Sequence, residues 1–299
     1  MPDRKNTPPQ IREASTVILV RENKKNLEVY LLKRSTKSGF MGGLYVFPGG
    51  VVEPEDKGID TWISHIDMGP DQISKQLGGN GFSTADALGF GIAAIRETIE
   101  EAGVLMASNK NKHGFYDIAA LRLNKDLPNP WFRTEIGNRS WTLSFSSLGR
   151  WSHWITPELM KKRFNTRFFI AFMPENQTCE PDNQEVEDGI WLSPQKALEQ
   201  NFTAQTPLSP PAVATMTQLL EFNHIDELKN EIKTRSWGDP IAPRLVSSSR
   251  GPVILEPWDP MFDKNCKIDV SKLSEKLLSP GSSFSRIWCD SGVWKPIGI

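Results

Sequence analysis

Two apolar runs near the N-terminus carry the first clear pattern of the chain. Residues 15–20, STVILV, and residues 28–34, EVYLLKR, are rich in β-branched and aromatic side chains, and polar residues separate them. Such a pair predicts two strands joined as a β-hairpin. A glycine-rich segment, SGFMGG at 38–43, and a further short strand, LYVF at 44–47, are expected to follow.

A long helix is the next element that the pattern predicts. Residues 53–81 are polar and interrupted by glycines, with at most a short helix near TWISHI. The run ADALGFGIAAIRETIEEA at 85–102 then has the composition of a helix. Ser83 or Thr84 stands where an N-cap is needed, and Gly103 stands where a left-handed residue closes a helix.

The second half of the chain continues the alternation of strands and helices. We expect strands at 150–157, 167–174 and 190–193, with an acidic loop at 175–189 before the last of them. Strand pairs flanked by helices predict an α/β fold with a mixed sheet and helices on its faces. Further helices are expected at 194–201, 209–222, 225–234 and 270–278, and a terminal hairpin at 284–299 that turns at 290–292.

Composition narrows the class of protein. The 299 residues carry 35 basic and 36 acidic side chains, so overall charge attracts neither nucleic acid nor an anionic membrane. No apolar run is long enough for a transmembrane helix, and the N-terminus does not resemble a secretory signal. The C-terminal KPIGI differs from the Ser-Lys-Leu peroxisomal address. We therefore expect a soluble, cytoplasmic protein without a membrane or nucleic-acid partner; a homodimer stays open.

Three glutamates stand at the end of the long predicted helix, where they are unfavourable. Glu97, Glu100 and Glu101 share one helical face, and Glu97 and Glu101 repel by about 0.2–0.5 kcal/mol. The helix dipole disfavours each by about 0.3–1 kcal/mol. Arg96 can relieve Glu100 only. Carboxylates in such excess suit a divalent cation such as magnesium, and the alternative is a solvated acidic face.

The surroundings of these glutamates resemble a known family. FPGGVVEPED at 47–56 together with RETIEEAG at 96–103 is similar to the two halves of the Nudix box. Asp56 takes the place of the first glutamate, and 39 residues (57–95) separate the halves where the box has seven. A long insertion at this point is a feature of Nudix enzymes that resemble the peroxisomal coenzyme A diphosphatases. The resemblance covers residues 14–220.

The resemblance implies a fold and an activity. It implies a Nudix α/β/α sandwich over residues 10–206, an insertion at 57–87 inside the box, and a C-terminal extension at 207–299 packed on the same domain. The implied activity is Mg²⁺- or Mn²⁺-dependent hydrolysis of a nucleotide phosphoanhydride, with coenzyme A or acyl-CoA as the first candidate. NADH, ADP-ribose, a nucleotide sugar or capped RNA stays open. A nucleotide sensor that binds without cleavage is the alternative of another class.

The same resemblance assigns candidate site residues. Glu97, Glu100, Glu101 and the carbonyl of Gly49 match the metal ligands of the family, and Arg96 would orient the carboxylates.

The general base and the substrate contacts are further expectations. The base is either the first helix glutamate or an acidic residue of the later loop, among which Glu185 comes before Glu187 and Asp188. Lys33 and Arg34 end a strand beside the expected site and are candidates for phosphate contacts. Phe40 could cover an adenine or a pantetheine arm, or belong to the core. The insertion is expected to act as a lid or to shape the substrate site.

Overall fold

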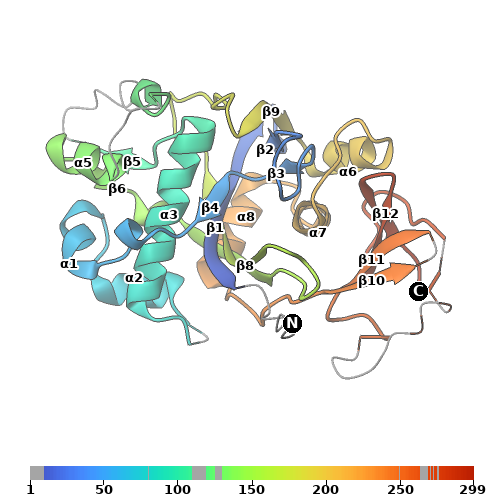
Figure 1. Cartoon of the computed structure of the whole chain (residues 1–299). Helices are drawn as coiled ribbons and strands as arrows, with labels where there is room; N and C mark the ends of the chain where they lie inside the picture. Colours follow the sequence, from blue (N-terminus) through green and yellow to red (C-terminus); the bar gives the residue numbers. More distant parts are fainter. Residues whose placement is uncertain are drawn as a thin grey trace, which may run out of the picture.

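The structure is a computed structural model, and it describes residues 10–79, 81–109, 119–124, 130–248, 250–262, 269, 271, 273–274 and 276–299. A mixed β-sheet lies at its centre, with helices on both faces (Figure 1). The main path of this sheet runs β3-β2-β1-β8-β7, while β4 pairs with β1 and β9 pairs with β2. Its strands are β1 (Ile11–Asn23), β2 (Asn26–Arg34), β3 (Tyr45–Val46), β4 (Gly49–Val51), β7 (Gly149–Ile155), β8 (Arg163–Phe172) and β9 (Val186–Leu192).

The predicted N-terminal hairpin is confirmed. Strands β1 and β2 are antiparallel, and Asn23 pairs with Asn26 at the turn. Lys24 and Lys25 both have positive φ, at 50° and 67°, which is the backbone that a two-residue hairpin turn requires. Strand β1 also pairs in parallel with β8 over ten positions, so the sheet is mixed as expected.

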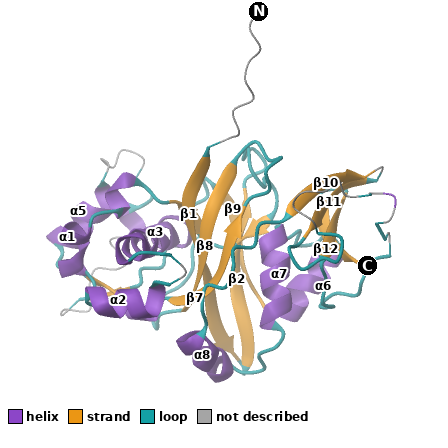
Figure 2. Cartoon of the chain, turned by 90° about the horizontal axis from the view of Figure 1, so that it is seen from below, coloured by secondary structure: helices purple, strands orange, loops and turns teal. Residues whose placement is uncertain are grey.

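Alternate residues of β1 and β2 supply two separate hydrophobic cores. Val17 and Leu19 pack with α3 (Thr84–Ala102) on one face, while Ile18 and Val20 pack with α7 (Pro210–Leu219) on the other. The helices α6 (Pro194–Phe202) and α8 (Ile225–Thr234) lie on the α7 side (Figure 2). This period of two along each strand produces the three layers of the fold.

Helix α3 has the ends that the sequence predicts. The hydroxyl oxygen of Ser83 accepts a hydrogen bond from the backbone N–H of Asp86, and Gly103 closes the helix with φ 71°. The hydroxyl of Ser15 on β1 donates to the carbonyl of Phe90 at 2.7 Å, which fixes α3 on the sheet. The helix therefore presents its last two turns to β4 at a fixed register.

The stretch before α3 contains more structure than we predicted. The expected short helix near residue 61 is present as α1 (Ile59–Trp62), followed by a 3₁₀ turn at Ile63–His65. Helix α2 (Pro70–Leu77) was not predicted, because Gly69 and Pro70 look like a break. Proline is favoured at the first position of a helix, and Pro70 stands there.

The inserted segment is part of the core on the α3 side. Trp62, Ile73 and Leu77 are at most 1 % exposed and pack in the same cluster as α3. The indole N–H of Trp237 donates to the carbonyl oxygen of Leu77 at 2.7 Å, across 160 positions of the chain. The guanidinium of Arg150 donates to the carbonyl of Gly78 at 3.1 Å. Distant segments thus cap the end of α2, and the insertion is held by packing and hydrogen bonds.

A further small layer covers this side of the molecule. It consists of α5 (Trp131–Asn138), the two-stranded sheet of β5 (Ala107–Ser108) and β6 (Thr142–Leu143), and a 3₁₀ turn at Phe145–Ser147. None of these elements was predicted, since each is shorter than the window of about 11–18 residues over which a periodic pattern can be recognised.

The C-terminal part forms a separate antiparallel sheet beside α6 (Figure 1). It contains β10 (Arg244–Ser248), β11 (Gly251–Leu255), β12 (Arg286–Asp290) and β13 (Val293–Ile297). The terminal hairpin β12–β13 is confirmed, whereas β10 and β11 were not predicted. The helix expected at 270–278 is wrong where the structure describes this stretch, because residues 273–274 and 276–278 are not helical and Leu277 instead pairs with Ile297 in a β-bridge. The side-chain amide of Asn201 on α6 donates to the carbonyl of Trp294 at 2.8 Å, which joins this sheet to the central fold.

Two buried carboxylates follow β11 and differ in their partners. Asp259 accepts hydrogen bonds from the guanidinium of Arg286 and from the hydroxyl of Ser285, both at 2.6 Å. Glu256 is fully buried, and its oxygens have no hydrogen-bond partner among the described residues. Burial raises the pKa of Glu256 to about 8.

Within the same described ranges, no helix is long and apolar enough to cross a membrane.

Candidate active site

The end of α3 lies directly against the two glycines of β4. Gly49 and Gly50 pair with β1, and the backbone N–H of Gly49 donates to the Glu101 carboxylate at 2.8 Å. A Cβ atom at Gly50 would lie 2.4 Å from Oε1 of Glu97, so a side chain there would displace the carboxylate. The two glycines therefore allow backbone and carboxylates to approach.

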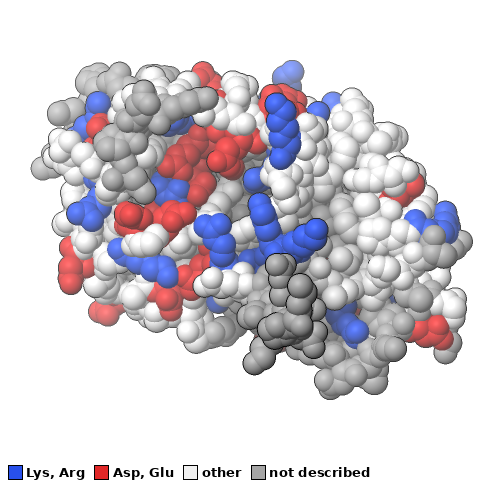
Figure 3. All heavy atoms as spheres, in the orientation of Figure 1, with Lys and Arg blue, Asp and Glu red and all other residues white. Residues whose placement is uncertain are grey.

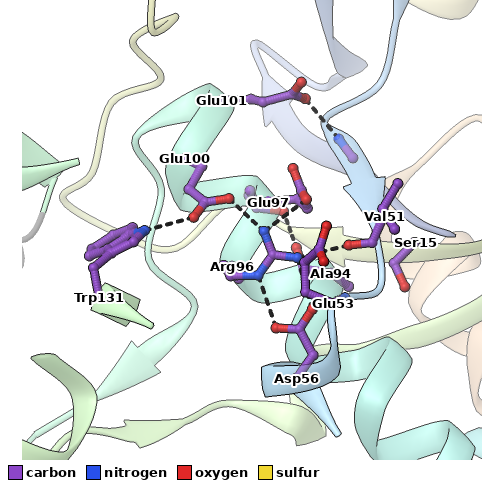
Figure 4. A network of polar contacts seen from close by, with 12 residues as sticks. Ser15, Val51, Glu53, Asp56, Ala94, Arg96, Glu97, Glu100, Glu101 and Trp131 are labelled. Atoms are coloured by element: carbon purple, nitrogen blue, oxygen red, sulfur yellow. Dashed lines mark hydrogen bonds and ion pairs between the residues drawn. The ribbon is translucent and has the colours of Figure 1, made fainter. Parts of the chain in front are cut away.

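Arg96 is the centre of the polar network at this site (Figure 4). Its Nε and Nη2 atoms donate to the two oxygens of Asp56 at 2.9 and 2.8 Å. Its Nη1 atom donates to Glu97 at 2.8 Å and to Glu100 at 2.6 Å, and Nη2 also reaches the carbonyl of Val51. Neighbouring carboxylates raise the pKa of Arg96 against the effect of its own burial, so this side chain stays charged. Arg96 thus fixes the positions of three carboxylates.

The three glutamates do not have the same surroundings. Glu100 uses both carboxylate oxygens, one with Arg96 and the other with the indole N–H of Trp131 at 2.9 Å. Glu97 and Glu101 each keep one oxygen without a hydrogen-bond partner among the described residues. In the described part of the chain, no three acidic, histidine or cysteine side chains converge on one point as a ready metal cage.

The low exposure of these carboxylates makes their charged forms unfavourable, and Arg96 compensates them only in part. Desolvation raises the pKa of Glu97 to about 7, with the charge of Glu100 adding to the rise and Arg96 opposing it. It also raises the pKa of Glu100, which Arg96 and the indole of Trp131 oppose.

For Glu101, burial raises the pKa well above its usual value and the charge of Glu97 raises it further, while the N–H of Gly49 and Arg34 act in the opposite direction. The donor set therefore fits a divalent cation: oxygen ligands, free lone pairs on Glu97 and Glu101, and excess negative charge.

Two other predicted site residues lie within electrostatic range of the same centre. The charges of Arg34 and Glu185 both act on Glu101, in opposite directions. Glu185 comes directly before β9, and its carbonyl accepts a hydrogen bond from the N–H of Ser35. The acidic loop is shorter than predicted, because β9 begins at Val186 and pairs with the end of β2. The structure thus brings Arg34, Glu185 and Glu101 to one side of the sheet.

The other candidates have different positions. Lys33 precedes Arg34 and pairs with Tyr45, which packs in the core on the α7 face. Its side chain follows the alternation of Leu31 and lies on the face away from α3. Glu187 accepts a hydrogen bond from the N–H of Thr36, and Asp188 accepts one from the Tyr45 hydroxyl at 3.1 Å. These two acids thus fix the segment after β2.

Phe40 packs edge-on against Phe164 with ring centres 5.1 Å apart, and it stays half-buried.

Trp131 is the site residue that the sequence did not reveal. It stands among ten tryptophans, and it lies 31 positions from the glutamate that it contacts. Only the fold of the segment after α3 brings the two together. A weak local signal exists, since Pro130 directly precedes Trp131 at the start of a helix.

Comparison with known proteins shows which family this chain resembles. The sequence model of the family described as NUDT19 Nudix domain matches residues 11–219. An acyl-coenzyme A diphosphatase NUDT19 of Xenopus laevis is 29% identical, over 89% of this chain and 81% of that protein. The human protein of the same name is 26% identical, over 86% of this chain and 79% of its own.

A solved structure supports the fold. The crystal structure of a Nudix hydrolase from Alicyclobacillus acidocaldarius superposes with a TM-score of 0.61, covering 77% of this chain and 99% of the other at 20% identity.

Proposed function

Because the chain belongs to the NUDT19 Nudix domain family, we propose that it hydrolyses the phosphoanhydride bond of coenzyme A or of an acyl-coenzyme A. In this reaction the oxygen of water forms a bond to one phosphorus of the diphosphate. The bond from that phosphorus to the bridging oxygen breaks, and the bridging oxygen leaves on the other phosphate. The products are adenosine 3′,5′-bisphosphate and phosphopantetheine or its acyl derivative.

The observation that carries this proposal is the pair Glu97 and Glu101 beside Gly49 and Gly50, in which Glu101 is buried and the Glu97 side chain is 14% exposed. Two desolvated carboxylates with free oxygens cannot accept an anionic diphosphate directly, because like charges repel more strongly away from water. The glycines allow the backbone of β4 to approach the Glu97 carboxylate closely. Carboxylates and a diphosphate become compatible when a divalent cation lies between them.

We assign the cation, Mg²⁺ or Mn²⁺, to the oxygens of Glu97 and Glu101, with Glu100 and the carbonyl of Gly49 completing the set. Nudix hydrolases in general use a divalent metal. When bound, such a cation neutralises phosphate oxygens and lowers the pKa of a coordinated water. Glu100 would join by exchanging its bond to Arg96 or to Trp131.

The protein residues around the cation have distinct proposed roles. Arg96, held by Asp56, positions the carboxylates and does not meet the substrate. Arg34 lies on the α3 side near Glu101, where its guanidinium can bind a phosphate oxygen. Glu185 is the proposed general base, since it is exposed, within electrostatic range of Glu101 and able to accept a proton from water. A base of this kind contributes about 10²–10⁴-fold to the rate.

Alternative substrates share the same chemistry. NADH, ADP-ribose, a nucleotide sugar and a capped RNA all contain a phosphoanhydride between two larger groups. A sensor that binds such a ligand without cleavage is the alternative of another class. The full set of helix glutamates together with Arg96 favours the enzyme, because binding alone does not need three carboxylates that oppose their own helix dipole.

The test is a comparison of substrates with purified protein and Mg²⁺. We expect release of adenosine 3′,5′-bisphosphate from CoA and acetyl-CoA at higher kcat/KM than cleavage of NADH, ADP-ribose or UDP-glucose. Glu97→Gln keeps the size of the side chain and removes its charge, so the reaction should fall by more than about 100-fold. Glu221→Gln, on an exposed position, is the matched control. A preference for another substrate would keep the chemistry and reject coenzyme A. Binding without any cleavage would favour the sensor.

A further inference from the structure

Two basic side chains, Arg34 at the end of β2 and Lys162 from another part of the chain, border the loop that follows β2. Arg34, whose charge acts on Glu101, reaches the hydroxyl of Ser38 with Nε and Nη2, both at 3.4 Å. Gly39 follows Ser38 and lies close to the ammonium group of Lys162. A Cβ atom built at this glycine would be 3.2 Å from Nζ of Lys162. Since neighbouring Cα atoms are about 3.8 Å apart, Arg34 and Lys162 border the same short stretch of backbone.

Lys162 belongs to a different part of the chain, the turn between β7 and β8. This turn is fixed against the glycine-rich loop, because the rings of Phe40 and Phe164 meet edge-on at 5.1 Å. The guanidinium of Arg163 and the hydroxyl of Thr156 close the turn through bonds to its backbone, at 3.2 and 3.0 Å. The position of Lys162 relative to the loop is therefore set by packing on both sides.

The ammonium group of Lys162 is available to a ligand. The side chain is exposed, and it makes no ion pair with any residue that the structure describes. Lysine and arginine side chains gather beside a band of aspartates and glutamates on this face of the molecule (Figure 3). An anionic substrate that binds at the glutamates through a cation would thus have basic side chains on one of its sides.

We propose that Lys162 binds a phosphomonoester on the ribose of the substrate and so distinguishes coenzyme A from nucleotides without that phosphate. The proposal rests on the function proposed above. Coenzyme A carries a 3′-phosphate on the ribose, one sugar away from the diphosphate that is cleaved. The acidic centre repels this additional dianion, so a site that accepts it needs a cation outside the reach of the glutamates. Arg34 binds the diphosphate, and Lys162, which reaches the loop at Gly39 from the β7–β8 turn, binds the ribose phosphate.

The experiment compares coenzyme A with 3′-dephospho-coenzyme A as substrates of the Mg²⁺-loaded protein. In Lys162→Ala we expect kcat/KM for coenzyme A to fall about tenfold, the loss of one charge-assisted hydrogen bond. The value for 3′-dephospho-coenzyme A should change by less than about twofold. Lys162→Arg, which keeps the charge, should retain most of the preference for coenzyme A.

The neighbouring lysine provides the matched control. Lys161→Ala removes the same charge from the same turn, where Lys161 is exposed and has no described contact with Gly39. The assignment to Lys162 is overturned if Lys161→Ala lowers kcat/KM for coenzyme A by an equal factor. It is also overturned if Lys162→Ala lowers kcat/KM equally for coenzyme A and 3′-dephospho-coenzyme A. NADPH and NADH form a second pair, which separates a 2′-phosphate from a 3′-phosphate. A larger loss for NADPH than for coenzyme A would also overturn the assignment.

A binding measurement separates this proposal from the proposed function. Calorimetry with adenosine 3′,5′-bisphosphate and with adenosine 5′-monophosphate does not require hydrolysis. We expect the bisphosphate to bind wild type about tenfold more tightly than the monophosphate, and Lys162→Ala to remove that difference. If the protein cleaves neither coenzyme A compound, the proposed function fails. If wild type binds adenosine 3′,5′-bisphosphate and adenosine 5′-monophosphate equally, the proposed ribose phosphate site is wrong, whether or not the protein cleaves coenzyme A.

Discussion

Arg96 and Asp56 form a two-bond ion pair across forty positions of the chain, with donor–acceptor distances of 2.9 and 2.8 Å. The Arg96 side chain is 12% exposed and that of Asp56 is 2% exposed, so the pair is almost dry. Asp56 also accepts the backbone N–H of Glu53 at 2.8 Å. The insertion separates the two halves of the Nudix box along the chain, and this pair brings them back into contact.

The first prediction concerns this pair. Asp56→Ala removes two hydrogen bonds from the Arg96 guanidinium, which keeps Glu97 and Glu100, so we expect the free energy of unfolding to fall by about 1.5–3 kcal/mol. Chemical denaturation monitored by circular dichroism measures it. Asp60→Ala, on an exposed acid of the inserted segment, should change stability by less than about 0.5 kcal/mol. Equal effects would mean that the ion pair does not connect the two halves.

The second prediction concerns the approach of Gly50 to Glu97. Gly50→Ala places a methyl group 2.4 Å from Oε1 of Glu97, so either β4 or the carboxylate must move. We expect kcat to fall by about 100-fold or more, because misplacement by about 1 Å already costs that much. Gly137→Ala, at a helical glycine with open space around it, should leave activity unchanged and keep or slightly raise stability. An active Gly50→Ala enzyme would show that this contact is not needed.

Metal binding is predicted to stabilise the fold. Addition of Mg²⁺ or Mn²⁺ should raise the melting temperature, by an amount that grows with concentration, and EDTA should reverse it. The gain should be larger at pH 8 than at pH 5.5, because carboxylates must lose their protons to bind a cation. In the double variant Glu97→Gln/Glu101→Gln the gain should disappear. A gain that survives in this variant would place the cation elsewhere.

A fourth prediction tests whether the inserted segment is structural. Leu77 is completely buried at the end of α2, and Leu77→Ala should lower the free energy of unfolding by about 2–5 kcal/mol. Replacement of residues 57–86 by a Gly/Ser bridge should accordingly give a protein that unfolds at lower temperature. If the shortened chain melts like wild type and only KM changes, the segment is a lid rather than part of the core.

The pKa of Glu256 predicts the direction of a pH effect. Burial raises this pKa to about 8, so the unfolded chain loses the proton first as pH rises. The destabilisation begins near the ordinary glutamate pKa of about 4.3 and is complete above pH 8. Glu256→Gln cannot ionise, and its melting temperature should exceed that of wild type by a margin that grows from pH 5 to pH 8. A margin that is constant over this range would contradict the assignment.

The residues that the sequence reveals are those whose role follows from local rules. Helix α3 was predictable because its cap, Ser83, its closing glycine, Gly103, and its apolar period all lie within one segment. The spacing of the glutamates is likewise sufficient to predict that they share one helical face. The difference between Glu100, which uses both of its oxygens, and Glu97 and Glu101, which each use one, was not predictable, since it depends on Trp131.

Other elements escaped because tertiary contacts decide them. Residues 186–189 look like an acidic loop, yet pairing with β2 makes them a strand. Strand β11 begins with Gly251 and Pro252, which normally indicate a turn, and its pairing with β10 and β12 overrides that signal. Lys162 was invisible for the same reason, because only the packing of Phe40 on Phe164 brings its turn to the glycine-rich loop.

The bond from Trp237 to Leu77 has a consequence for the order in which the chain can fold. A ribosome adds about 5–20 residues per second, so about 8–32 s separate the emergence of the two partners, which are 160 positions apart. During this interval the carbonyl of Leu77 lacks its indole donor, and the core on the α3 side lacks Trp237. The nascent protein is therefore most exposed to chaperones and proteases at its inserted segment, until translation has passed Trp237.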